Sequence, residues 1–249
     1  MRVDIDVVMD RSVPGATRWE ICGTRLSMPL ELSTPAAPIK PLLRGVSHQV
    51  ACVVALVAGA ILLAFTPGGD PRRAVITYTI SLATLFGISA LYHRPTWRPR
   101  ARQWMRRLDH ASIFVFIAGT YTPLSLALSP SQGAILRAVV WGGALAGVLQ
   151  SVLWVTAPKP LIAVLYVVLG WSIVPFAREV YAAFGAVPLS LVLAGGVVYS
   201  VGALVYAKRR PDPWPRVFGY HEVFHALVIV AAVLHFVAVT MVVRPRGLA

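Results

Sequence analysis

The sequence predicts an all-α integral membrane protein, a bundle of seven transmembrane helices. Composition is the first observation behind this fold class. Hydrophobic residues make up 57% of the 249 residues, charged residues make up 13%, and the mean hydropathy is +0.70, which is too apolar for a soluble domain of this length. The formal net charge of +13 does not indicate a nucleic-acid partner, because the Lys and Arg residues lie in short clusters between apolar runs.

The spacing of the apolar residues is the second observation. Seven apolar runs are each about 20 residues long, enough to cross a hydrocarbon core of about 30 Å at 1.5 Å per residue. They cover residues 46–66, 73–92, 109–128, 134–155, 160–182, 187–207 and 222–243. Segments rich in Pro, Gly and Arg separate them. The fifth run is the weakest, because Pro175, Arg178 and Glu179 interrupt its second half.

The seven-helix domain is therefore expected at residues 46–243, between an arm (1–45) and a short tail (244–249). The arm has no clear period and contains a Pro- and Ser-rich stretch at 33–38, so we expect it to be disordered. Met1 and Met28 are both compatible with its start. The first apolar run lacks a cleavage site and stays as a helix rather than a signal peptide. Cys22 and Cys52 form no disulfide framework.

The distribution of basic residues predicts the orientation. Thirteen lie on the side of the arm: Lys40, Arg44, Arg94, Arg98, Arg100, Arg102, Arg106, Arg107, Lys159, Lys208, Arg209, Arg210 and Arg216. Six lie on the other side: Arg72, Arg73, Arg137, Arg178, Arg244 and Arg246. The positive-inside rule then makes the N-terminus cytoplasmic and the C-terminus external, in the cell membrane. This orientation disfavours a G-protein-coupled receptor, and the last helix has no lysine for a retinal Schiff base.

Four ionisable residues are expected at one depth, on the cytoplasmic side. His93 ends the second run, Asp109 opens the third, and His221 and His225 open the seventh. His221 and His225 are spaced i, i+4 and share a helical face. Three imidazoles from two helices, with a water as fourth ligand, make the open tetrahedral arrangement of a catalytic zinc. The remaining histidines, His48, His110 and His235, are expected to take part in helix packing.

A zinc metalloprotease is an alternative interpretation of the same residues. The segment His221-Glu222-Val223-Phe224-His225 matches H-E-x-x-H, the helical motif of these proteases in which the Glu is the general base. Such a protease needs a third ligand further along the chain. Glu222 is the last acidic residue, and His235 lacks the required Gly-x-x-His spacing. We therefore interpret Glu222 as a negative charge at a helix start, where it is favourable to the helix dipole.

Several motifs resemble the hemolysin III family, over roughly residues 40–243. They are Ser89-Ala90-Leu91-Tyr92-His93, Leu108-Asp109-His110-Ala111-Ser112-Ile113, Gly119-Thr120-Tyr121-Thr122-Pro123 and Gly219-Tyr220-His221-Glu222-Val223-Phe224-His225. That family is similar to the progestin/adipoQ receptors and, more distantly, to alkaline ceramidases. The resemblance implies that His93, His221 and His225 bind zinc and that Asp109 and Ser89 serve the zinc-bound water or stabilise the site.

A site of this kind among apolar helices suggests a zinc-dependent hydrolase that cleaves a lipid amide, such as a ceramide, entering from the bilayer. Asp109 would act as general base and Ser89 would hold the developing oxyanion. The alternative is a non-catalytic membrane-homeostasis sensor or receptor-like protein in which zinc only joins helices. A cytolysin ranks last, because the chain lacks secretion and amphipathic-insertion signals.

Overall fold

The computed structural model describes residues 19–21, 24–26, 40–154 and 156–244, and the chain divides into two units, Met1–Ile39 and Lys40–Ala249. In the first unit, β1 (Trp19–Ile21) pairs antiparallel with β2 (Thr24–Leu26). The other residues of the predicted disordered arm up to residue 39 lie outside the described part. Residues 40–45 belong to the second unit, as a turn that leads into the first helix.

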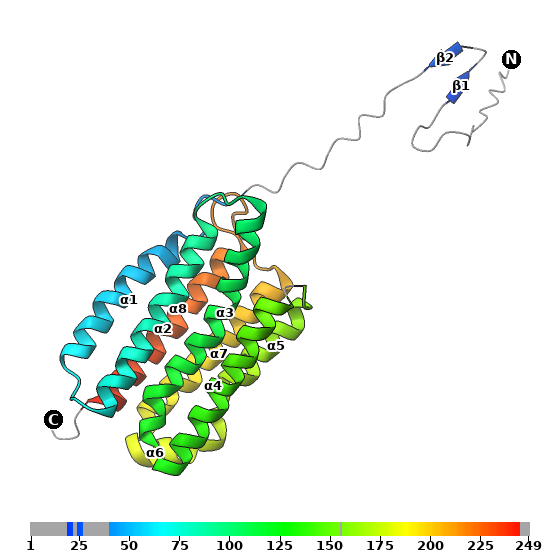
Figure 1. The fold of residues 1–249 in the computed structure, drawn as a ribbon. Helices are drawn as coiled ribbons and strands as arrows, with labels where there is room; N and C mark the ends of the chain where they lie inside the picture. Colours follow the sequence, from blue (N-terminus) through cyan, green and yellow to red (C-terminus); the bar gives the residue numbers. More distant parts are fainter. Residues whose placement is uncertain (1–18, 22–23, 27–39, 155, 245–249) are drawn as a thin grey trace. The chain divides into compact units, whose positions relative to one another are not determined.

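The second unit is all-helical in its described residues and has seven segments long and apolar enough to cross a membrane (Figure 1). The helices are α1 (Val46–Ala64), α2 (Asp70–His93), α3 (Pro99–Leu124), α4 (Pro130–Leu153), α5 (Lys159–Gly170), α6 (Ala177–Phe184), α7 (Ala186–Lys208) and α8 (Tyr220–Val243). Short 3-10 turns, η1 (Ser125–Ala127) and η2 (Val174–Phe176), follow α3 and precede α6. The predicted seven-helix fold is confirmed.

The fifth crossing, whose second half Pro175, Arg178 and Glu179 were expected to interrupt, is broken. It consists of α5, the turn η2 and α6 in place of one continuous helix. Pro175 lies in η2 and cannot donate the backbone hydrogen bond that a continuous helix needs. Glu179 in α6 accepts a hydrogen bond from the Gln132 side chain of α4, over 3.2 Å, so the polar end of this crossing is fixed to a neighbouring helix.

The third helix begins ten residues earlier than predicted, at Pro99 instead of residue 109. Pro at the first helical position is favourable, because its missing N–H would have no partner there. Apolar residues mark only the part of a helix that lies in lipid, and α3 continues beyond that part through a basic stretch. Arg100, Arg102, Arg106 and Arg107 therefore lie on a helix and not in a loop.

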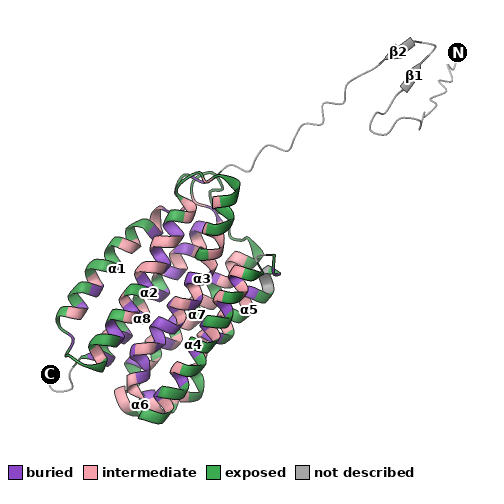
Figure 2. Ribbon diagram, in the orientation of Figure 1, coloured by how far each residue is buried: buried purple, intermediate pink, exposed green. Residues whose placement is uncertain are grey.

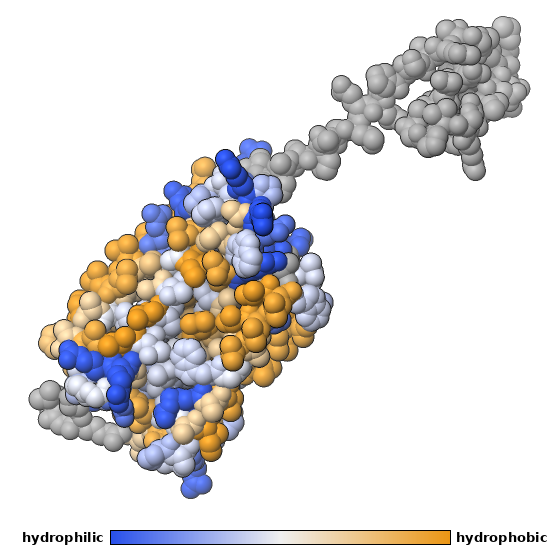
Figure 3. Space-filling model, in the orientation of Figure 1, coloured by the Kyte–Doolittle hydropathy of each residue, from blue (hydrophilic) through white to orange (hydrophobic). Residues whose placement is uncertain are grey.

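The helices pack around α3, whose apolar segment is the most buried of the seven, at 67%. Neighbouring pairs in contact include α2 with α3, α7 with α8 and α1 with α2. Tyr78, Phe114, Leu136 and Val239 are completely enclosed. The outward faces of α1 and α4 are exposed and apolar (Figures 2 and 3). The α7 helix also exposes apolar side chains, and such a surface is expected of a protein whose solvent is lipid.

Candidate metal centre

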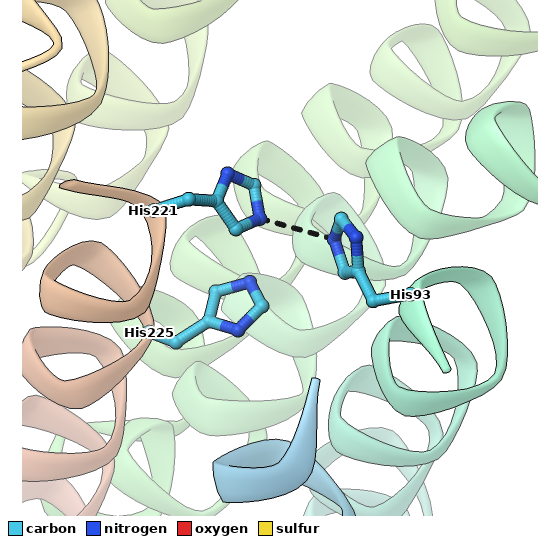
Figure 4. A group of neighbouring side chains, drawn as sticks. All are labelled: His93, His221 and His225. Atoms are coloured by element: carbon cyan, nitrogen blue, oxygen red, sulfur yellow. Dashed lines mark hydrogen bonds between the residues drawn. The ribbon is translucent and has the colours of Figure 1, made fainter. Parts of the chain in front are cut away.

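Three imidazole rings meet where the end of α2 faces the beginning of α8 (Figure 4). His93 is the last residue of α2, and His221 and His225 occupy the first two turns of α8. One ring nitrogen from each residue lies within 4.8 Å of the other two. The Nε2 atoms of His93 and His221 are 3.1 Å apart. His225 is 1% exposed and His221 is 9% exposed, while His93 is half-buried, so two of the three rings lie inside the protein and the third lies near its surface.

The start of α8 fixes the direction of both of its histidines. The Gly219 N–H donates to Glu222 Oε2 over 2.9 Å, and the Tyr220 N–H donates to Asp212 Oδ1 over 2.7 Å. These bonds satisfy backbone donors that a helix start leaves without partners. One turn of helix then brings His225 under His221 on the same face.

The cluster fits a metal ion in both spacing and donor type. In a tetrahedral zinc site with Zn–N bonds of about 2.0–2.1 Å, ligand nitrogens stand about 3.3 Å apart. Ring nitrogens within 4.8 Å of one another reach that arrangement through small side-chain rotations. The Nδ1 atom of His225 is buried and has no hydrogen-bond partner among the described residues. Three nitrogen ligands are typical of zinc and other borderline divalent metals.

Ser89 and Asp109 lie beside the cluster. Ser89 is 3% exposed and sits one turn before His93 on α2. Its side chain is hydrogen-bonded to the half-buried carboxyl group of Asp109 on α3. The structure therefore brings Asp109 to the level of the histidines although it does not open α3. Ser89 and Asp109 are thus neighbours that link α2 to α3 beside the histidines.

Glu222, the acidic residue of the H-E-x-x-H sequence, is held away from a protease role. It is 2% exposed, and its two carboxylate oxygens are both engaged, Oε1 by the Arg44 guanidinium and Oε2 by the Gly219 N–H. A general base must lie within hydrogen-bond reach of the attacking water, and these two contacts direct the Glu222 carboxylate to the entry of the first helix and the start of α8. Its position at the start of α8 agrees with the predicted helix-start charge.

The turn before α1 contacts both sides of the cluster. The N–H groups of Leu42 and Leu43 donate to the carbonyl groups of Arg216 and Val217 over 3.1 and 3.2 Å. The Lys40 ammonium group donates to the Arg94 carbonyl at the end of α2 over 2.7 Å. We call residues 40–45 the entry turn. It joins the end of α2 to the segment that precedes α8.

Gly45 allows the entry turn to pass directly over His93. Its φ of +80° lies in the left-handed region that favours glycine. A Cβ atom at this position would stand 2.8 Å from His93 Cβ, closer than side chains tolerate. The close approach therefore requires glycine for two separate reasons.

His48 is a fourth histidine at the centre. It packs between helices as predicted, but it also contacts one of the three clustered histidines. Its ring, 2% exposed, stacks on the His225 ring with centroids 3.8 Å apart and an interplanar angle of 12°. Arg44 and His48 were not predicted as site residues. Their i, i+4 spacing at the entrance to the first helix is the signal that was available.

His235 packs between helices as predicted. Its Nε2 atom is 3.0 Å from the Val192 carbonyl oxygen of α7, and its ring lies against Gly195, where a side chain would collide with it. It lies ten residues after His225, about 15 Å further along α8. This distance separates it from the metal centre.

Tyr206 of α7 is a further neighbour that the sequence did not reveal. Its ring stands edge-on to His221, with centroids 5.7 Å apart, and it is an electrostatic neighbour of Asp109. The Tyr92 ring lies tilted against the His93 ring, with centroids 4.5 Å apart and an interplanar angle of 52°. Two tyrosine rings thus contact the cluster, one from α7 and one from the end of α2.

The profile of the "Haemolysin-III related" family matches residues 37–236. The chain is 28% identical to "Hemolysin-3" of Bacillus cereus over 206 residues, 81% of this chain and 91% of the relative. It is 32% identical to "Heptahelical transmembrane protein ADIPOR2" of Oryza sativa subsp. japonica, over 72% and 85% of the two chains. It is 23% identical to "Monocyte to macrophage differentiation factor" of Homo sapiens, over 78% and 80%. The protein belongs to the haemolysin-III-related family of seven-helix membrane proteins.

Proposed function

We propose that the protein is a zinc-dependent hydrolase of lipid amides, with His93, His221 and His225 as the metal ligands. The observation that carries the proposal is the group of three imidazole nitrogens within 4.8 Å of one another, two from buried residues and one from a half-buried residue. Three protein ligands leave one position of a tetrahedral site open, whereas structural zinc sites are closed by four. When bound, zinc would supply a nucleophile near neutral pH and polarise the scissile carbonyl group.

Asp109 is the proposed general base. It would take a proton from the attacking water and return it to the leaving amine. The Ser89 hydroxyl would keep the carboxyl group in the required direction, because the two side chains are hydrogen-bonded. Glu222 is assigned no part in the proton transfer, because its carboxylate is directed to Arg44 and to the Gly219 N–H at the start of α8.

The proposed substrate class follows from the surroundings of the centre. Below the basic end at which the centre lies, the outward helix faces are apolar. A molecule that reaches the centre from the bilayer is therefore a lipid, and an amide lipid such as a ceramide matches an Asp base that returns a proton to an amine. The names of the relatives describe a hemolysin, a heptahelical transmembrane protein and a differentiation factor. They suggest no single activity, so the proposal depends on the geometry of the site.

The proposed orientation places the centre on the cytoplasmic side of the cell membrane. The entry turn and the start of α3 bring basic groups together at the histidine end. Burial lowers the pKa of Lys40, and the nearby guanidinium groups of Arg94, Arg44 and Arg102 lower it further. An excess of positive charge is typical of the cytoplasmic face.

The decisive experiment measures zinc content and hydrolysis on the same purified sample. We expect about one zinc per chain and release of fatty acid from short-chain ceramides in nanodiscs, lost on chelation and restored by zinc. A protein that holds zinc but cleaves no lipid amide or ester would contradict the enzymatic proposal. In that case zinc joins α2 to α8, and the sensor or receptor-like alternative explains the fold.

A further inference from the structure

The end of the bundle opposite the histidines contains a cavity of about 410 Å³. It lies between the start of α2, the end of α3 and the start of α4. Its polar lining includes Arg73, Thr77, Thr122, Ser125, Ser129 and Arg137. The volume is within the range of small-molecule sites. Since α2 runs from Asp70 at this cavity to His93 at the metal centre, the two sites are about 35 Å apart.

Arg137 is the unusual member of this lining. It lies seven residues into α4, about 10 Å from the helix start, in a segment apolar enough to cross a membrane. An ionisable side chain at that depth indicates a functional site unless it is paired. Among the described residues Arg137 forms no ion pair. Asp70, the carboxylate that lines the cavity, is paired with Arg73 and interacts with Arg137 only at longer range, without an ion pair.

The Arg137 side chain is directed between helices. It is half-buried, and its Nη1 atom donates to Ser125 Oγ over 2.8 Å. The fork of a guanidinium group has five N–H donors, and this bond uses one of them. Ser125 thus fixes the direction of the Arg137 guanidinium group. Of all side-chain groups, a guanidinium is the best suited to bind two oxygens of a phosphate at once.

The two hydroxyl groups nearest Arg137 have no hydrogen atom left to donate to a ligand. The Ser125 hydroxyl donates to the Thr122 carbonyl over 2.7 Å, and the Thr122 hydroxyl donates to the Ala118 carbonyl over 3.0 Å. Both hydroxyl hydrogens are therefore committed within the chain. The donors that remain for a ligand are those of the guanidinium groups, so the complementary ligand carries negatively charged acceptor oxygens.

We propose that this cavity is a phosphate-binding site with Arg137 as its principal donor and Arg73 as a second cation at its rim. A phosphate group satisfies the guanidinium fork and compensates the unpaired charge. The group can come from a phospholipid headgroup or from free phosphate, since the cavity lies near the end of the transmembrane helices. This site is independent of the metal centre and of the proposed hydrolysis.

Two probes distinguish the sources. The first is inorganic phosphate, titrated calorimetrically into protein in a phosphate-free maltoside detergent. The second is phosphatidylglycerol, whose retention on the protein is compared with that of phosphatidylcholine by native mass spectrometry. We expect saturable binding of at least one probe at about one per chain. Binding of phosphate alone identifies a soluble ligand, and selective retention of phosphatidylglycerol identifies a headgroup.

The test variant is Arg137→Gln, and the matched control is Arg178→Gln. Arg178 is exposed on α6, at the same end of the bundle, and does not line the cavity. We expect Arg137→Gln to weaken binding roughly tenfold or more, as the loss of charged hydrogen bonds implies, and Arg178→Gln to bind like the wild type. Arg137→Lys keeps the positive charge but lacks the guanidinium fork, so it should bind with an intermediate affinity. A graded loss from Arg to Lys to Gln would show that the Gln variant does not lose binding merely because it is misfolded.

Equal loss of binding in Arg137→Gln and Arg178→Gln would overturn the proposal, because it would indicate only a general surface charge. Wild-type protein that binds neither probe would overturn it as well. Zinc content serves as the folding control in every variant, because the metal centre lies at the other end of the bundle.

Discussion

The Arg44 guanidinium group and the Glu222 carboxylate form an ion pair across 178 residues of sequence. It joins the entry turn to the first turn of α8. Glu222 is 2% exposed and Arg44 is 21% exposed at the side chain. Because Glu222 lies next to His221 in sequence and also receives the Gly219 N–H, this pair holds the start of the helix that carries two of the three histidines.

Arg44→Ala is therefore expected to destabilise the protein and to weaken its hold on zinc. Removing one partner of a buried ion pair costs about 3–5 kcal/mol, and the partial exposure of Arg44 suggests the lower end. The measurements are the thermal midpoint and the zinc dissociation constant. Arg73→Ala is the matched control, since it breaks an exposed pair with Asp70 and should change neither. A similar loss of zinc affinity in both variants would contradict this role of Arg44.

The three proposed ligands should behave differently from the packing histidines. His93→Ala, His221→Ala or His225→Ala removes a nitrogen from the group and should strongly reduce the zinc content of purified protein. His235→Ala should leave zinc nearly unchanged, because its ring contacts Val192 and Gly195 far from the centre. Metal analysis of all four variants decides the assignment. Equal losses throughout would mean that the ligands are other residues.

His48 should affect how tightly zinc is held without being needed for its presence. Its ring stacks on His225, so His48→Ala leaves the His225 ring free to rotate and should weaken zinc binding roughly 10–100-fold, the usual effect of removing a neighbour that orients a ligand. Protein loaded with excess zinc should still contain one ion. His48→Phe keeps a flat ring and should recover most of the affinity. An affinity unchanged in His48→Ala would show that the stack has no orienting effect.

The fold was largely predictable because hydropathy directly reports which residues face lipid. The start of α3 was not, since Arg100 to Arg107 are helical but polar, and hydropathy cannot distinguish a helix in water from a loop. The histidines could be grouped from their i, i+4 spacing and common depth. Arg44 and His48 share an i, i+4 spacing, but this spacing does not tell which helices α1 packs against. Tyr206 has no local signal at all, because its role depends on the packing of α7.

The orientation is testable through single cysteines placed in a background without Cys22 and Cys52. We expect a cysteine between Arg94 and Arg98 to be protected from an impermeant thiol reagent in intact cells, and one in the segment 244–249 to react. The reason is the division of basic residues, thirteen to six, between the two ends. Labelling of the α2–α3 connection in intact cells, with protection of the tail, would reverse the orientation and place the metal centre outside.

Asp109→Asn tests the proposed chemistry most directly, because Asn keeps the size of Asp and accepts the Ser89 hydrogen bond but cannot take a proton. We expect it to retain zinc and to lower turnover of a short-chain ceramide by roughly 10²–10⁴-fold. Ser89→Ala should cause a smaller loss, since Ser89 acts by orienting Asp109. Glu222→Gln should keep most of the activity per bound zinc, as Glu222 serves the start of α8. If Asp109→Asn turns over like the wild type while Glu222→Gln is inactive with zinc bound, the base is Glu222 and the proton-transfer role assigned to Asp109 is wrong.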